Sequence, residues 1–162
     1  MQAKKITGVL ILLIACACQQ EKVVMSEAVK AAVIEDVRQA LNNYTAAIKQ
    51  GGLTAEFNYL DPSDDFFWIP PGYESPLSYD SVAAVLSANA PRFKSVENSF
   101  DTLRIIPLSE SLATYTAQLR SVMTDTSGNI ASLSLIESGV VIKRKDGWKL
   151  LSGHTSVITR KK

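Results

Sequence analysis

The segment that decides the fold is Lys145-Asp146-Gly147-Trp148-Lys149-Leu150-Leu151-Ser152-Gly153-His154-Thr155-Ser156. Asp146-Gly147 is a pair that accepts positive φ in a tight hairpin, and residues 140–145 and 148–159 on its two sides are rich in strand formers. The sequence therefore predicts a long antiparallel hairpin at the C-terminus. The same segment carries His154, the only histidine in the chain.

Upstream of the hairpin, the pattern predicts helices first and strands afterwards. Apolar residues spaced by three or four indicate one face of a long helix over residues 27–50: Val33, Val37, Ala40, Leu41, Tyr44 and Ile48. Ser26 is its expected N-cap and Gly51-Gly52 its stop. The other expected elements are a short helix after Thr54 with Phe57 and Leu60 inward, a buried strand over 66–69, a helix over 79–93, and strands over 96–107, 111–125, 130–145 and 148–159.

This order of elements predicts an α+β domain whose antiparallel sheet covers its apolar face with the helices. A strongly twisted sheet of such long strands, wrapped round the long helix, forms a cone with an open end. Cavity mouths of this kind are common ligand sites. We therefore expect a pocket in the cone.

The N-terminus has the pattern of an exported protein. Lys4 and Lys5 precede a short apolar run, and residues 1–15 are expected to be a signal peptide. The run ends in Leu13-Ile14-Ala15-Cys16, which resembles the lipobox of bacterial lipoproteins and implies acylation of Cys16. Cys18 fits this pattern less well, and an ordinary secretory leader with an incidental cysteine is the alternative.

The lipobox resemblance implies a protein that is anchored to a membrane through lipid, with residues 16–27 as the lipidated cysteine and polar tether. Ala17 stands where many inner-membrane lipoproteins have aspartate, which favours the outer membrane and a domain that faces the periplasm. Loss of residues 1–15 removes Lys4 and Lys5 and no acid, so 17 basic and 16 acidic residues become 15 and 16, a net charge of −1. That balance gives no indication of nucleic-acid binding.

Asp146-Gly147-Trp148-Lys149 followed by His154-Thr155-Ser156, together with the order of elements, resembles the SnoaL-like branch of the nuclear-transport-factor-2-like superfamily. The resemblance covers residues 28–160. It implies the cone fold, but it does not select a function, because isomerases, cyclases, dehydratases and binding modules share that fold.

The segment Asn43 to Leu53 looks like the first helix of the steroid isomerases in this superfamily. The likeness implies that Tyr44 is a hydrogen-bond donor to a ligand oxygen. It also places Pro70 where those enzymes have their catalytic aspartate, so the general base is missing. Their second oxyanion donor falls near Gly139, where Glu137 is the nearest acid.

Five residues are candidate ligand contacts: Tyr44, Trp68, Tyr115, Glu137 and His154. His154 lies six positions after Trp148, which puts both side chains on one face of a regular strand. If that face lines the cone, His154 is the candidate acid or base. A half-buried histidine that bonds a neighbouring strand is the structural alternative.

The sequence predicts binding of a small, mostly apolar molecule in the cone. The enzymatic alternative is an isomerase, cyclase or dehydratase in which His154 is the base and Tyr44 the oxyanion donor. A further alternative is a homodimeric interaction module, because residues 130–142 are apolar on both strand faces. One histidine and no cysteine after Cys18 argue against a zinc site, and no phosphate loop or nucleophile elbow indicates a cofactor or a covalent mechanism.

Overall fold

The computed structural model describes residues 25–159, so the predicted signal peptide, Cys16 and most of the tether lie outside the described residues. Its first element, α1 (Glu27–Gly51), is capped by the Ser26 side chain, which accepts a hydrogen bond from the Val29 backbone N–H at 3.3 Å. Gly52, with φ of 75°, ends it. The predicted limits of the long helix are thus confirmed.

The other elements follow in the expected order: η1 (Leu53–Tyr59), β1 (Phe67–Ile69), α2 (Tyr79–Asn89), η2 (Ala90–Arg92), β2 (Phe93–Ser109), β3 (Leu112–Asp125), β4 (Ile130–Arg144) and β5 (Gly147–Val157). The strands form one sheet in the order β1-β5-β4-β3-β2, antiparallel except for the pairing of β1 with β5. The predicted α+β fold with a strongly curved sheet is confirmed.

Two sequence expectations about the shorter elements were wrong. The helix predicted over 79–93 is α-helical only to Asn89, because Pro91 has no N–H to continue it; the 3-10 turn η2 follows, and β2 begins at Phe93. The expected buried strand is confined to Phe67–Ile69 at the sheet edge, and there Phe67 is exposed.

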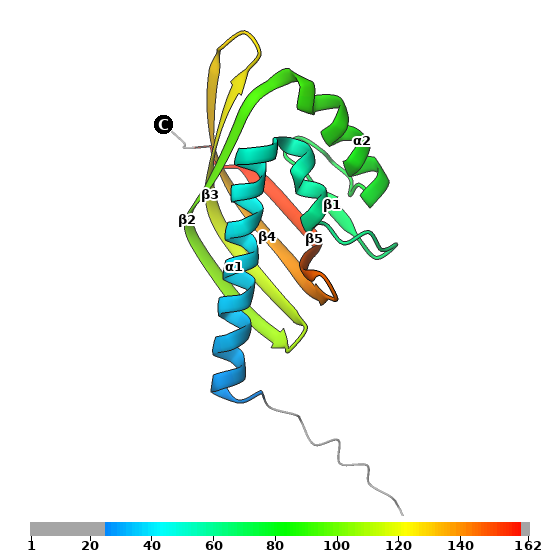
Figure 1. Cartoon of the computed structure of the whole chain (residues 1–162), viewed down its shortest axis with the longest axis vertical. Helices are drawn as coiled ribbons and strands as arrows, with labels where there is room; N and C mark the ends of the chain where they lie inside the picture. The colour runs from blue at the N-terminus through cyan, green and yellow to red at the C-terminus, as the bar shows by residue number, and fades with distance from the viewer. Residues whose placement is uncertain (1–24, 160–162) are drawn as a thin grey trace, which may run out of the picture.

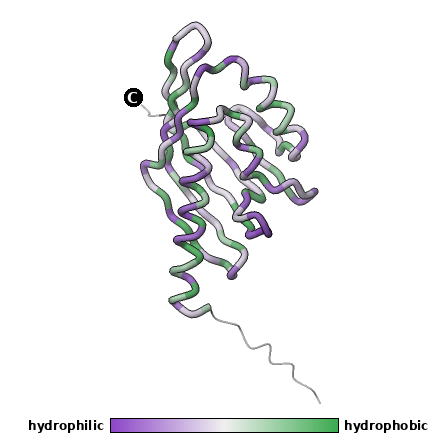
Figure 2. Tube along the Cα trace, in the orientation of Figure 1, coloured by the Kyte–Doolittle hydropathy of each residue, from purple (hydrophilic) through white to green (hydrophobic). Residues whose placement is uncertain are grey.

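The helices pack on the concave inner face of the sheet (Figure 1). Apolar residues of α1 pack with the inner faces of β2 to β5 in one core cluster that includes Val37, Leu41, Tyr115 and Trp148. A second cluster lies beneath α2 and η1. Figure 2 shows hydrophobic and hydrophilic residues alternating along α1 and the long strands, as expected for elements with one buried face.

A β-bulge in β5 decides which side chains point into the cone. Val140 pairs with Ser152 and Val141 pairs with Leu150, so Leu151 has no partner on β4. The extra residue shifts the alternation of the strand by one position. Trp148 and Thr155 are therefore both buried on the inner face, and His154 is exposed.

The outer face of the sheet carries exposed apolar side chains, among them Ile106, Leu108 and Ile136. No helix between residues 25 and 159 is both long and apolar enough to cross a membrane.

Candidate functional site

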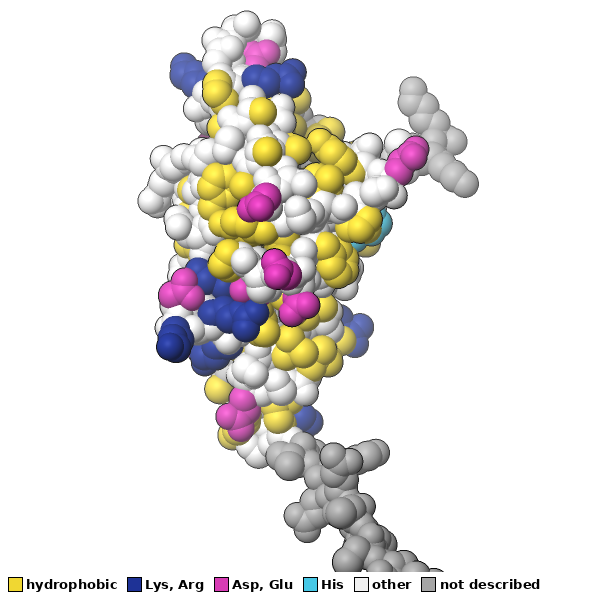
Figure 3. Space-filling model, turned by 90° about the vertical axis from the view of Figure 1, so that its right-hand side faces the viewer, with side chains coloured by type: hydrophobic (Ala, Val, Ile, Leu, Met, Phe, Trp, Pro, Cys, Tyr) yellow, Lys and Arg dark blue, Asp and Glu magenta, His cyan; other side chains and the backbone are white. Residues whose placement is uncertain are grey.

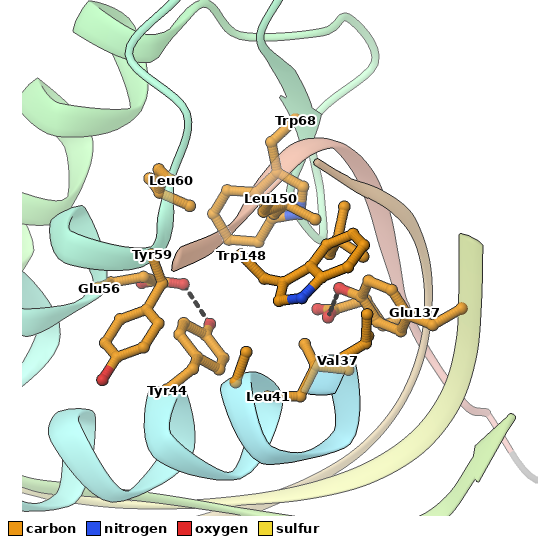
Figure 4. A pocket seen from close by; sticks show the side chains of 13 residues that line it. Val37, Leu41, Tyr44, Glu56, Tyr59, Leu60, Trp68, Glu137, Trp148 and Leu150 are labelled. Atoms are coloured by element: carbon orange, nitrogen blue, oxygen red, sulfur yellow. Dashed lines mark hydrogen bonds between the residues drawn. The ribbon is translucent and has the colours of Figure 1, made fainter. Parts of the chain in front are cut away.

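An inner chamber lies where α1 and η1 face the sheet (Figure 4). Its walls are mostly aliphatic and aromatic: Val37, Ala40, Leu41, Tyr44, Glu56, Tyr59, Leu60, Trp68, Tyr115, Glu137, Val141, Trp148 and Leu150. Its cavity volume, measured as the space open to the centre of a water molecule, is about 30 Å³. A water molecule needs about 10–15 Å³ by this measure, so the chamber is small.

An outer chamber adjoins the inner one beneath α2, with about 140 Å³ of such space. Four side chains line both chambers: Tyr44, Glu56, Trp68 and Glu137. The outer walls add more polar groups, including Thr45, Asn98, Ser121 and Thr155. The cone thus holds two adjoining chambers that share these four side chains, and both are lined mainly by apolar groups.

The first polar feature of the site is a pair between Tyr44 and Glu56. The Tyr44 hydroxyl on α1 donates a hydrogen bond to Glu56 Oε1 on η1 (Figure 4). Glu56 is only 6% exposed. Its burial is the main reason that its pKa rises to about 7; the Tyr44 hydrogen bond opposes this shift and the charge of Glu137 adds to it. Burial, followed by the charge of Glu56, likewise raises the pKa of Tyr44.

The second polar feature is a hydrogen-bonded chain around Glu137. The Tyr115 hydroxyl donates to Glu137 Oε1 at 2.6 Å, and the Thr155 hydroxyl donates to Glu137 Oε2 at 2.8 Å. Trp68 Nε1 donates to the Thr155 oxygen at 3.0 Å. Burial raises the pKa of Glu137, against the effect of the two hydroxyls. The chain fixes both Glu137 oxygens and joins three strands of the sheet with β1.

Gly139 makes room for this arrangement. It pairs with Tyr115 across β3 and β4, and a Cβ at Gly139 would lie 2.8 Å from Tyr115 Cε1 and 2.8 Å from the Ser152 carbonyl oxygen. Real Cβ atoms do not approach so closely. A side chain at this position would displace the Tyr115 ring that bonds Glu137.

The site is acidic and has unused hydrogen-bonding groups. Among residues 25–159, no Lys, Arg or His side chain lines either chamber. Two buried atoms there have no hydrogen-bond partner in the protein, Trp148 Nε1 in the inner chamber and Asn98 Oδ1 in the outer one. One is a donor and the other an acceptor, so the walls can still bond a ligand.

The prediction that His154 faces the cone is wrong. The bulge at Leu151 turns its side chain to the outer face, where His154 Nε2 lies 3.2 Å from Ser156 Oγ. It lines neither chamber, and Figure 3 shows it, the only histidine, at the surface. An acid or base at Tyr44 must therefore be a different group.

The other predicted contacts, Tyr44, Trp68, Tyr115 and Glu137, all line the inner chamber. Glu56 does so too, and sequence reasoning missed it. Its spacing is the signal: Leu53, Glu56 and Tyr59 are three residues apart, which puts them on one side of the 3-10 helix η1. An acid at an inward position of an amphipathic segment indicates a buried functional or paired group.

The acidic turn after η1 has a structural role. Asp61 is 2% exposed and accepts two hydrogen bonds from Arg144, at 3.0 Å from Nε and 2.6 Å from Nη2. Ser63 Oγ donates a third at 2.6 Å. Within the described part of the chain, no group of three or more His, Cys, Asp or Glu side chains is placed to hold a metal ion.

Solved structures with the same fold are numerous, and their sequence identities to this chain are low. One is a nuclear transport factor 2-like superfamily protein from Salmonella enterica serovar Typhimurium, with TM-score 0.68, 15% identity, and coverage of 82% of this chain and 95% of the other. Another, from Novosphingobium aromaticivorans, is provisionally named a scytalone dehydratase (TM-score 0.73, 11% identity, 83% and 89% covered). A third is a ketosteroid isomerase-like protein from Erwinia carotovora atroseptica (TM-score 0.60, 17% identity, 78% and 96% covered).

These likenesses concern the fold alone. No curated protein matches the chain by sequence. The family model of the SnoaL-like domain matches residues 37–160, which include α1 from Val37 and the whole sheet. The chain therefore belongs to the SnoaL-like domain family.

Proposed function

We propose that the protein is a membrane-anchored, exported domain that binds a small, mostly apolar molecule in its cone. The observation that carries the binding proposal is the pair of adjoining chambers inside the cone. The inner chamber is walled by aliphatic and aromatic side chains, and its polar groups are concentrated in the two Tyr–Glu pairs. A few fixed polar groups on an apolar wall are typical of small-molecule sites.

The limited free space sets the size of the ligand. The inner chamber has room for a ring or a short branched chain only after small movements of its walls, and the outer chamber admits more. Trp148 Nε1 offers a hydrogen bond to a ligand oxygen. We infer a compact ligand with an apolar body and an oxygen atom.

Tryptophan fluorescence tests this proposal, because Trp68 and Trp148 are the only tryptophans of the chain and both line the inner chamber. Cyclohexanol, a compact and mostly apolar alcohol, serves as the probe. We expect a saturable change in emission. Ala40→Leu, which fills the chamber, is expected to weaken binding by about tenfold or more, a difference of ~1.4 kcal/mol. Ala46→Leu, exposed on the same helix, is the matched control and is expected to bind as the wild type does.

Acid–base catalysis is the second candidate, and the Glu56 pKa of about 7 favours it. A carboxyl that titrates near neutrality can both accept and return a proton. Glu56 would take the proton from a carbon beside a carbonyl and return it to another carbon of the same molecule, so the isomerisation consumes no reagent. The names given to two proteins of the same fold, a scytalone dehydratase and a ketosteroid isomerase-like protein, are compatible with such chemistry.

Exchange of the protons beside the carbonyl of cyclohexanone, followed by NMR in D₂O, tests this candidate. Wild-type protein is expected to accelerate the exchange and Glu56→Gln to abolish the acceleration. His154→Ala is the control, because His154 is exposed and lies outside the chambers. Equal rates for wild type and Glu56→Gln would exclude Glu56 as the base.

The lipid anchor at Cys16 and an outer-membrane, periplasm-facing location are proposed from the Leu13-Ile14-Ala15-Cys16 pattern.

A homodimer through the outer sheet face is proposed from the exposed Ile106, Leu108 and Ile136. Light scattering tests the dimer: a monomer at all concentrations would contradict it.

A further inference from the structure

The acidic side chains of the cone lie together at one place. Glu56 and Glu137 both line the boundary between the two chambers, and the unpartnered Asn98 Oδ1 lines the outer one. No basic side chain from residues 25–159 faces them there. A positively charged ligand would find two carboxyl groups here, whereas a negatively charged ligand would be repelled without any compensating partner.

Aromatic side chains surround these acceptors. Tyr44, Tyr59, Trp68, Tyr115 and Trp148 come from α1, η1, β1, β3 and β5, and all five line the inner chamber. The Tyr44 and Tyr59 rings pack edge to face with centroids 5.7 Å apart. Electron-rich ring faces attract cations, and the Trp148 ring already has one over it, since Lys143 Nζ lies 5.7 Å from its centroid.

An independent observation at Trp148 indicates a ligand. Trp148 is 7% exposed, and its Nε1 is buried at the chamber without a protein partner. A buried indole N–H normally finds an acceptor. The chamber thus offers a donor on one wall and acceptors on others, which specifies a ligand with both an oxygen and a group that donates.

We propose that the ligand is a small alicyclic or aromatic amine, bound as its ammonium ion between Glu56 and Glu137, with an oxygen atom that accepts from Trp148. This inference rests on the proposed binding function and adds the chemical class of the ligand. The ammonium ion would make charge-assisted hydrogen bonds with the carboxylates, which are about twice as strong as neutral ones. The ring faces would replace part of its hydration.

Amine binding is expected to depend on pH through the carboxyls. The groups that face Glu56 are Tyr44 from α1, Tyr59 from its own η1, Tyr115 from β3 and Glu137 from β4. None is a cation that would oppose the effect of burial, which raises the pKa of Glu56 to about 7. An incoming ammonium ion favours the carboxylate, which releases the Glu56 proton. Affinity should therefore rise as the pH rises through 7.

Calorimetry with three probes of one shape tests the ligand class. They are 2-aminocyclohexanol, cyclohexanol, and 2-hydroxycyclohexanecarboxylate, which share the ring and the hydroxyl and differ in charge. At about pH 8 the amine is expected to bind about tenfold or more tighter than cyclohexanol, and the carboxylate weakest of the three. In buffers of different ionisation enthalpy near pH 7, the amine is expected to release protons on binding.

The outcomes separate the two proposals. If cyclohexanol binds as tightly as the amine, the cone binds ligands but the amine class is wrong. If no probe binds, both proposals fail. Glu56→Gln should reduce the preference for the amine over cyclohexanol, and an unchanged preference would overturn the assignment. The wild-type probe series decides the matter even if this variant does not fold.

Discussion

The Tyr44 hydroxyl donates a hydrogen bond to the Glu56 carboxyl inside the cone, and this contact joins the long helix to the short helical turn that follows it. The contact holds a carboxyl group against an apolar wall. Among the described residues, no basic side chain lines either chamber. The protonation of Glu56 is therefore coupled to folding as well as to ligand binding.

Replacement of Glu56 by Gln should change how stability depends on pH. Because the folded-state pKa of about 7 exceeds the ordinary value of 4.5, the folded protein holds this proton more tightly than the unfolded chain. That stabilisation is complete below pH 4.5 and is lost as the pH rises to about 7. The free energy of unfolding of Glu56→Gln, relative to that of the wild type, should therefore rise by about 3 kcal/mol between pH 4.5 and about 7. Urea unfolding of both proteins at a series of pH values measures it; parallel curves would refute the buried, titrating Glu56.

Asp61→Asn should destabilise the protein by about 1–2 kcal/mol, because the buried Asp61 loses charge-assisted hydrogen bonds from Arg144. The effect stays moderate because Arg144 is 39% exposed and water can solvate its charge. Arg144 also lowers the pKa of Asp61, so this contribution is present above pH 3.8 and is lost as the pH falls through the folded-state pKa. Asp64→Asn, exposed in the same turn, is the control. Equal unfolding free energies for both variants would show that the pair contributes nothing.

Gly139→Ala should cost about 1–3 kcal/mol through overpacking against Tyr115, Leu150 and the Ser152 carbonyl. It should also weaken cyclohexanol binding, because Tyr115 then no longer positions Glu137. The exposed neighbour Ser138 provides the control as Ser138→Ala. Thermal unfolding and the fluorescence titration together check both effects, and a Gly139→Ala variant as stable as the wild type would contradict the close packing.

Cys16→Ser should abolish incorporation of labelled fatty acid and move the protein from the membrane fraction to the soluble fraction, since acylation supplies the proposed anchor. Cys18→Ser should leave both properties unchanged. Loss of labelling in the Cys18 variant alone would assign the anchor to the other cysteine.

The fold could be predicted from the sequence because its main elements follow strong local rules. The spacing of Val33, Val37 and Leu41 placed one face of α1 on the sheet, and that face carries Tyr44. Asp146-Gly147 marked the last hairpin, and Gly147 does adopt a positive φ of 118°. Periodicity of this kind determines which face of a long element is buried.

The site could be predicted only in part. Strict alternation along β5 put His154 on the same face as Trp148. The unpaired Leu151 shifts that alternation by one residue, so Thr155 points inward instead of His154. A bulge depends on the register of two strands, and nothing in the composition of β5 marks it. Glu56 was missed because its hydrogen-bond partner, Tyr44, lies twelve positions away on another element, and only the local spacing signalled its inward position.

The two indole N–H signals of the protein test the central claim most directly, since Trp68 and Trp148 are the only tryptophans and both line the inner chamber. In a ¹⁵N-labelled sample titrated with cyclohexanol, we predict that both signals move saturably and show magnetisation transfer to the ligand ring. Trp148 should move most, because its N–H gains an acceptor, whereas Trp68 already donates to Thr155. Two stationary indole signals at saturating cyclohexanol would contradict a ligand site in the cone.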